Sequence, residues 1–195
     1  MSDHSETVSL MTDRLPTSPR VITRCTEWAR DMLQPGRAVI LDTETTGLNG
    51  FVVELAVLDP ATRRPLLDTL VRPPVPVEAE AQQVHGISNA MLEDAPSWSE
   101  VLPSLLTVTR SRTLIAYNAA FDAGVIARHT RATGRLLEHL AEAHRWACLM
   151  ERRAIWDGTG QRTRLGASHR AVGDCRAALE LLDLIAAGSA QPPHP

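Results

Sequence analysis

The sequence predicts an α/β domain with a mixed central sheet, and three observations support this prediction. The chain has 195 residues and is 44% apolar, which is enough for one domain with its own core. Three strand-like segments follow one another with short links, a pattern that favours an antiparallel meander. Helical and strand-like segments then alternate, which favours helices packed in layers on the sheet.

We expect four parts along the chain, with boundaries 1–20, 21–34, 35–188 and 189–195. The first part is rich in Ser, Thr, Asp and Pro and is expected to be a disordered tail. The second part has apolar residues at helical spacing and stops before a Pro-Gly pair, which predicts an N-terminal helix. The third part is the main domain, and the fourth is a short C-terminal tail.

The meander is expected at 38–44, 51–58 and 66–72. Its first segment begins with an apolar run (Ala-Val-Ile-Leu), which is typical of a buried strand. The Gly-Leu-Asn-Gly sequence at 47–50 predicts a tight turn to the second strand, and the Asp-Pro pair at 59–60 predicts the next turn.

The remaining elements are expected as five helices and two strands. The helices are predicted at 78–84, 88–93, 97–109, 119–132 and 170–187, and the strands at 113–117 and 145–149. Ser97 and Glu100 have the spacing of a capping box at the start of the third of these helices. The last helix carries apolar residues on one face and stops at Gly188.

Composition excludes several classes of protein. The net charge of −3 gives no overall positive field to attract nucleic acid, although all twenty basic residues are arginine, which suits forked contacts to phosphate. Cys25, Cys148 and Cys175 form no CxxC pair, so we expect reduced thiols in the cytoplasm and no zinc site. No signal peptide and no apolar stretch of membrane-spanning length is evident.

Two carboxylates stand at the end of the first strand. Residues two apart in a strand project from the same face, so Asp42 and Glu44 are expected to point together. Like charges at this distance repel, and a hard divalent cation with oxygen ligands is the simplest remedy.

Two further acids follow the same logic. Asp122 follows another apolar strand and lies at the start of a helix. Asp174 lies in the first turn of the last helix, five residues after His169. Strand ends and helix starts are where α/β sheets hold ligands, so these acids are candidates for the same site.

The segments LDTETTG (41–47), YNAAFD (117–122) and HRAVGD (169–174), in this order, resemble the three motifs of the DEDDh branch of 3′–5′ exonucleases. This branch includes the proofreading subunit of bacterial DNA polymerase III, ribonuclease T and oligoribonuclease. The resemblance runs from about residue 38 to 187 and implies a ribonuclease H-like fold. It also implies hydrolysis of phosphodiester bonds with two divalent metal ions, Mg²⁺ or Mn²⁺.

The resemblance assigns a role to each residue that matches the motifs. Asp42 is expected to bridge both metals, and Asp122 to support the second. Glu44 and Asp174 are expected to complete the site of the metal that holds the attacking water. His169 is expected to act as general base toward that water, which suits an imidazole with its ordinary pKa near neutrality.

The same resemblance implies that Thr45, Thr46, Gly47 and Leu48 contact the 3′-terminal nucleotide. The structural alternative is an ordinary turn with Gly47 at positive φ.

Four other positions have two interpretations each. Phe121 either stacks on bases or belongs to the core. Asn118 either holds the substrate strand or caps the next helix, with capping slightly favoured. His85 either lines the nucleotide pocket or is a structural loop residue. Glu54 is interpreted as a paired or solvated strand acid rather than a metal ligand.

The segment 150–168 is shorter than in many relatives, so we expect a more open wall on that side of the site. Five arginines in and after this segment are candidates for a track along the phosphates of a single strand. They are Arg152, Arg153, Arg162, Arg164 and Arg170.

The sequence therefore predicts a metal-dependent 3′–5′ exonuclease that acts on single-stranded or frayed DNA, or on short RNA, from a 3′-hydroxyl end. Two alternatives from other classes are a non-catalytic adaptor that binds nucleic acid or a polymerase, and a glycosidase-like enzyme with two carboxylates. The choice between DNA and RNA stays open at this point, as does a partner such as a polymerase or a second copy of the chain.

Overall fold

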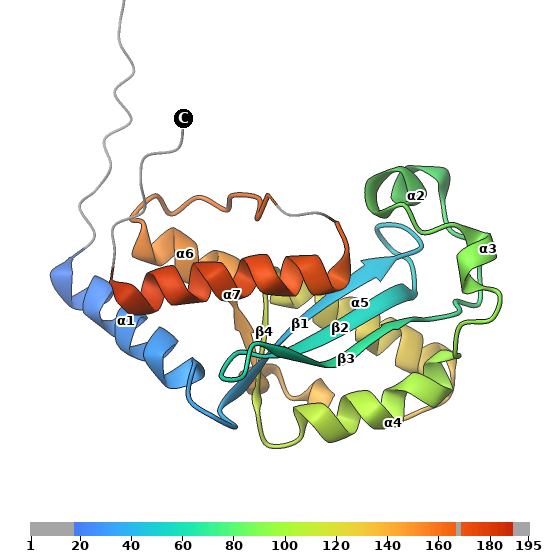
Figure 1. Ribbon diagram of the computed structural model, residues 1–195, viewed down its shortest axis with the longest axis horizontal. Helices are drawn as coiled ribbons and strands as arrows, with labels where there is room; N and C mark the ends of the chain where they lie inside the picture. Colours follow the sequence, from blue (N-terminus) through green and yellow to red (C-terminus); the bar gives the residue numbers. More distant parts are fainter. Residues whose placement is uncertain (1–17, 167–168, 189–195) are drawn as a thin grey trace, which may run out of the picture.

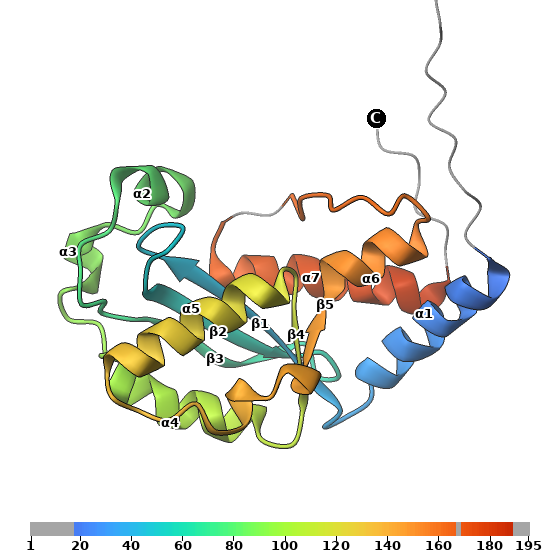
Figure 2. The same cartoon turned by 180° about the vertical axis from the view of Figure 1, so that it is seen from behind.

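The protein is described by a computed structural model, which defines residues 18–166 and 169–188. Most of the predicted N-terminal tail and the whole predicted C-terminal tail lie outside these residues. A central sheet is covered by helices on both faces (Figures 1 and 2). No helix in the described part of the chain combines the length and the apolar character needed to cross a membrane.

The sheet has five strands in the order β3-β2-β1-β4-β5. The predicted meander is formed by β1 (Ala38–Thr45), β2 (Val52–Asp59) and β3 (Arg64–Leu70), which pair antiparallel. On the other side of β1, β4 (Thr113–Ala116) and then β5 (Trp146–Cys148) pair parallel, as expected for a mixed sheet.

Seven α-helices surround the sheet among the described residues. They are α1 (Pro19–Met32), α2 (Ala79–His85), α3 (Asn89–Leu92), α4 (Trp98–Thr109), α5 (Ala119–Ala132), α6 (Leu149–Trp156) and α7 (Ala171–Ala187). The capping box predicted at the start of α4 is present, because the Ser97 N–H and hydroxyl both contact a Glu100 carboxylate oxygen.

Side chains that alternate along the strands divide the core into two main layers. Ala38 and Ile40 of β1 face α7 and α1, while Val39 and Leu41 face α4 and α5. The helix α7 crosses the near face of the sheet in Figure 1, and α5 crosses the near face in Figure 2. The helices α2 and α3 form a smaller cluster around Val53, beyond the ends of β1 and β2.

Three short elements were not predicted: α6 and two 3₁₀ helices, Glu138–Ala141 and Ala143–Arg145. The buried face of α6 includes Arg153, which interrupts the apolar spacing that would have indicated a helix. The strand β3 also begins two residues earlier than predicted, because a tight turn with Arg63 at φ 60° brings Arg64 opposite Asp59.

The turn after β1 is fixed by its own hydrogen bonds. The Thr46 N–H donates to the Phe51 carbonyl (2.9 Å), the Phe51 N–H to the Thr46 hydroxyl (3.0 Å), and the Gly50 N–H to the Gly47 carbonyl (2.8 Å). A Cβ atom on Gly50 would lie 2.2 Å from the Thr46 Oγ1 atom and 2.6 Å from the Gly47 nitrogen. Gly50 is therefore required by close packing within the turn.

We expect Gly50→Ala to lower the free energy of unfolding by about 1–3 kcal/mol, because the turn must open to admit the methyl group. Gly124→Ala is the matched control, since a Cβ on this helical glycine meets nothing within 4 Å and removes backbone freedom from the unfolded chain. Urea denaturation of both variants measures the difference. Equal stability of Gly50→Ala and the wild type would contradict the close packing.

Candidate active site

The residues predicted to be catalytic meet at one cavity. The cavity has a volume of about 150 Å³ and lies at the carboxyl ends of β1 and β4, beside the first turn of α7. It is lined by Asp42, Thr43, Glu44, Tyr117, Asn118, Phe121, Asp122, Leu165, His169 and Asp174. All five residues that the motifs assign to catalysis are in this list.

Three of the four carboxylates form a compact group. Asp42 and Glu44 lie on the face of β1 that α7 covers, and Asp174 comes from the first turn of α7. One oxygen from each of these three side chains lies within 4.8 Å of the others. The Oδ1 atom of Asp174 is buried and has no hydrogen-bond partner among the described residues.

Asp122 reaches the cavity from the opposite face of the sheet. It lies in the first turn of α5, is buried, and accepts a hydrogen bond from the Thr43 hydroxyl (2.8 Å). Thr43 points to this face because it stands between Asp42 and Glu44 in the strand. The strand thus presents two carboxylates to α7 and orients a third through Thr43.

Burial and mutual repulsion raise the pKa of every carboxyl group in the cavity. Desolvation is the largest cause for all four. It raises the pKa of Asp42 well above its ordinary value, with further contributions from the charges of Asp122, Asp174 and Glu44. The pKa of Glu44 is raised to about 8 and that of Asp122 to about 7, the latter despite the hydrogen bond from Thr43.

The donor set fits divalent cations. Carboxylate oxygens are the ligands that Mg²⁺ and Mn²⁺ prefer, and three of them lie within reach of one ion. A cation would also give the buried Asp174 oxygen a partner and offset the repulsion that raises these pKa values. Asp42, Glu44 and Asp174 are the residues that can hold one ion directly, and Asp122 lines the same cavity.

His169 stands two residues before the start of α7, is exposed, and lines the cavity. Its backbone has φ 52°, in the left-handed region that non-glycine residues rarely adopt.

The turn residues predicted to contact substrate lie outside the lining of this cavity. The Thr45 hydroxyl donates to the Gly47 carbonyl (2.9 Å), and the Thr46 hydroxyl accepts from the Phe51 N–H within the turn after β1. Leu48 is 84% exposed at the tip of the turn. The expected positive φ at Gly47 is wrong; instead, a Cβ there would lie 2.2 Å from a carboxylate oxygen of Glu78.

Two of the ambiguous residues line the cavity and one is structural. Asn118 makes no side-chain cap hydrogen bond, so the capping interpretation is wrong, and its side chain faces the cavity with Phe121. His85 is buried; the Ile87 N–H donates to its Nδ1 atom (3.0 Å), so its Nε2–H donates to the Thr45 carbonyl (3.1 Å). His85 therefore braces the end of β1.

Sequence reasoning missed three residues that line the cavity: Thr43, Tyr117 and Leu165. The Tyr117 hydroxyl donates to the Thr163 carbonyl and accepts from Arg153 (3.4 Å), which attaches the loop carrying Leu165 to the end of β4. The position of Tyr117 at a strand end, just before Asn118, was the available signal. Leu165 had none, because an irregular loop brings it to the cavity.

The predicted arginine track is only partly available in the structure. Arg152 lies over the Trp28 ring (4.4 Å to its centroid), Arg162 pairs with Glu151, and Arg170 pairs with Glu54. Arg153 is buried, whereas Arg164 is exposed. Most of these side chains are thus engaged within the protein.

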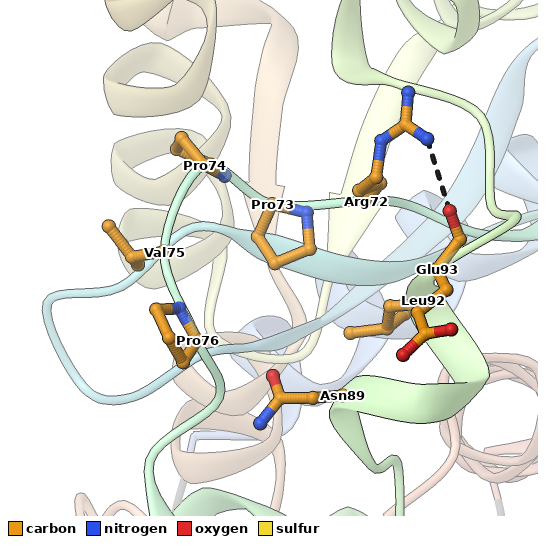
Figure 3. Close-up of a pocket in the computed structure, with 8 residues that line it drawn as sticks. All are labelled: Arg72, Pro73, Pro74, Val75, Pro76, Asn89, Leu92 and Glu93. Atoms are coloured by element: carbon orange, nitrogen blue, oxygen red, sulfur yellow. Dashed lines mark hydrogen bonds between the residues drawn. The ribbon is translucent and has the colours of Figure 1, made fainter.

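A larger hollow, of about 470 Å³, lies between the segment after β3 and the helix α3 (Figure 3). It is lined by Arg72, Pro73, Pro74, Val75, Pro76, Asn89, Leu92 and Glu93. The Arg72 guanidinium there donates to the Glu93 carbonyl (3.1 Å). Its lining contains a single carboxyl side chain, that of Glu93, whereas four carboxyl side chains line the smaller cavity.

Comparisons with known proteins identify the family to which this chain belongs. A family model described as an exonuclease matches residues 39–182. An uncharacterized exonuclease of Escherichia phage 186 is 29% identical, over 89% of this chain and 98% of that protein. Exodeoxyribonuclease 10 of Escherichia coli (strain K12) is 36% identical, over 61% of this chain and 48% of that protein, so the match spans about half of that relative.

Among solved structures, Exonuclease X in complex with 5′ overhanging duplex DNA is similar, with a TM-score of 0.54 and 31% identity. The similarity covers 80% of this chain and 94% of that chain, and it confirms the ribonuclease H-like arrangement of sheet and helices. The three acidic motifs and the histidine gather at one cavity, and the chain belongs to the exonuclease family.

Proposed function

We propose that this protein hydrolyses phosphodiester bonds one nucleotide at a time from a 3′-hydroxyl end of single-stranded or frayed nucleic acid, releasing nucleoside 5′-monophosphates. The observation that carries this proposal is the convergence of Asp42, Glu44 and Asp174 within 4.8 Å, with Asp122 and His169 on the same cavity. Such a set suits phosphoryl transfer, which depends mainly on positioning and on neutralising charge.

The proposed cofactors are two divalent cations, Mg²⁺ or Mn²⁺. When bound, they would neutralise the phosphate and lower the pKa of a water molecule that attacks it. Asp42, Glu44 and Asp174 would hold the ion nearest the water, and Asp122 would support the second. A ring nitrogen of His169 would accept the proton that this water loses.

The substrate would approach over the exposed turn at the end of β1. Leu48 is exposed there and is available to pack against a base, while Phe121 and Asn118 line the cavity itself. The DNA bound to the similar Exonuclease X is a duplex with 5′ overhangs, whose 3′ ends are recessed. This supports a nucleic-acid end as the substrate.

Product analysis on matched DNA and RNA oligonucleotides tests the proposal. With Mn²⁺, a 5′-labelled strand with a free 3′-hydroxyl should shorten stepwise and release mononucleotides, and a 3′-blocked strand should resist. EDTA should stop the reaction. Internal cleavage, or no degradation of either nucleic acid, would overturn the proposal.

We expect His169→Ala to lower kcat by roughly 10²–10⁴-fold, the usual contribution of general acid–base catalysis. Mn²⁺ affinity should stay near that of the wild type, because the carboxylates are untouched. His144→Ala is the control, since that imidazole is exposed on a 3₁₀ helix and does not line the cavity. A kcat of His169→Ala equal to that of the control would exclude His169 as the base.

A further inference from the structure

Glu54 is a buried acid close to the cavity that no catalytic role explains. It lies on β2 directly opposite Glu44 of β1 and is 3% exposed. An ionised carboxylate at this depth is unfavourable unless other groups compensate its charge. Its compensation comes from the third motif, 116 residues further along the chain.

The Glu54 carboxylate accepts hydrogen bonds from both the side chain and the main chain of that motif. The Arg170 Nε–H approaches both of its oxygens (3.1 Å each), and the Arg170 Nη2–H donates to Oε1 (2.5 Å). The Ala171 N–H donates to Oε2 (2.9 Å). A forked arginine pair of this kind fixes orientation as well as distance.

The main-chain bond places Glu54 at the N-terminus of α7. Ala171 is the first residue of that helix, and Arg170 is its N-cap but supplies no side-chain cap hydrogen bond. The first N–H groups of a helix have no partner within it. Glu54 therefore provides from β2 the cap that the motif itself lacks.

The residue just before this clamp is His169, in its left-handed backbone conformation. Such a conformation persists only where surrounding contacts impose it. The helix α7, which carries Asp174, is also held by Ala171, Cys175 and Ala178 in the core. His169 lies outside the helix and is exposed, so its orientation depends on what fixes Arg170 and Ala171.

We propose that Glu54 and Arg170 are positioning residues that set the His169 imidazole at the cavity. The proposal rests on the proposed exonuclease function of His169. Glu54 on β2 holds the Arg170 side chain of the third motif. The pair therefore fixes the backbone next to His169 relative to the sheet. Displacement of a catalytic group by about 1 Å can cost roughly 10²-fold in rate.

The test compares Arg170→Lys and Arg170→Ala with the wild type. Lysine keeps the charge but not the fork, so kcat should fall moderately in Arg170→Lys and by roughly 10²-fold in Arg170→Ala. KM for the oligonucleotide and Mn²⁺ affinity should be unchanged, since neither ground-state binding nor the carboxylates are altered. Arg112→Ala is the control, because it removes a partly buried pair with Asp59 that lies outside the cavity.

A double-mutant cycle separates positioning from a purely structural role. Arg170→Ala should cause no further loss of kcat when His169 is already alanine, because the clamp then has no imidazole to orient. Equal losses in both backgrounds, or a wild-type kcat in Arg170→Ala, would overturn the proposal.

The imidazole proton signals of His169 in NMR spectra give a readout that needs no activity. Their assignment follows from their disappearance in His169→Ala. The chemical shifts of these signals should change in Arg170→Lys and should equal those of the wild type in Arg112→Ala. If they move while the wild type degrades no nucleic acid, the exonuclease proposal fails and the positioning stands. If they stay while the wild type is active, the positioning alone fails.

Discussion

Asp42→Asn is expected to reduce Mn²⁺-dependent exonuclease activity to the level of the metal-free protein while making that metal-free protein more stable. The pKa of Asp42 is raised by burial and by the charges of Asp122, Asp174 and Glu44. Removing its charge therefore relieves repulsion in the folded state. The same charge is needed to hold cations at the cavity.

The opposite directions of these two effects make the experiment specific. In EDTA at pH 7.5 we expect Tm to rise by at least about 3 °C, which for a domain of this size corresponds to roughly 1 kcal/mol. Asp183→Asn is the control, because this acid forms a surface pair with Arg63 away from the cavity. Loss of activity together with a lower Tm would show that Asp42 supports the fold rather than a metal site.

The stability of the metal-free protein is expected to fall as pH rises from about 5 to 8. The pKa of Glu44 is raised from 4.5 to about 8, and that of Asp122 from 3.8 to about 7. Between these limits the folded state retains protons that the unfolded state has released, so the free energy of unfolding decreases with increasing pH. The stabilisation that protonated Glu44 and Asp122 give the folded state is fully present below pH 4. It is lost as the pH rises through 7 to 8.

Mn²⁺ should reverse this trend, because it replaces the protons on the same carboxylates. The increase in Tm on adding Mn²⁺ should therefore be larger at pH 8 than at pH 5.5. Thermal denaturation across this range, with and without Mn²⁺, measures both effects, and Glu44→Gln should flatten the metal-free curve. A metal-free Tm that rises steadily from pH 5 to 8 would contradict the electrostatics of the cavity.

The sequence predicted the fold well where local patterns and tertiary packing agree. The helix α5 was predicted with its observed bounds, and the meander strands within two residues, because their apolar spacing matches the faces that they bury. The helix α6 was missed since its buried face contains Arg153, whose partners besides the nearby Asp157 lie outside the helix, at the Tyr117 hydroxyl and the Arg164 carbonyl. No local pattern can show such a partner.

In the candidate site, too, the sequence predicted residues that belong to local motifs and missed contacts between distant segments. Asp42, Glu44, Asp122, His169 and Asp174 were predicted from the three motifs, and all five line one cavity, where the end of β1 meets the starts of α5 and α7. Asn118 was expected to cap α5, but its side chain faces the cavity. Glu54 was expected to be a paired or solvated strand acid, and its partner Arg170 could not be named because 116 residues separate them.

A titration with Mn²⁺ followed by electron paramagnetic resonance measures directly whether the four carboxylates hold a pair of cations. The wild type is predicted to bind two ions per chain, with the spin coupling expected of neighbouring ions, and Asp42→Asn is predicted to lose the coupled signal. A wild type that binds no Mn²⁺, or that binds equally in Asp42→Asn, would contradict the metal-dependent mechanism.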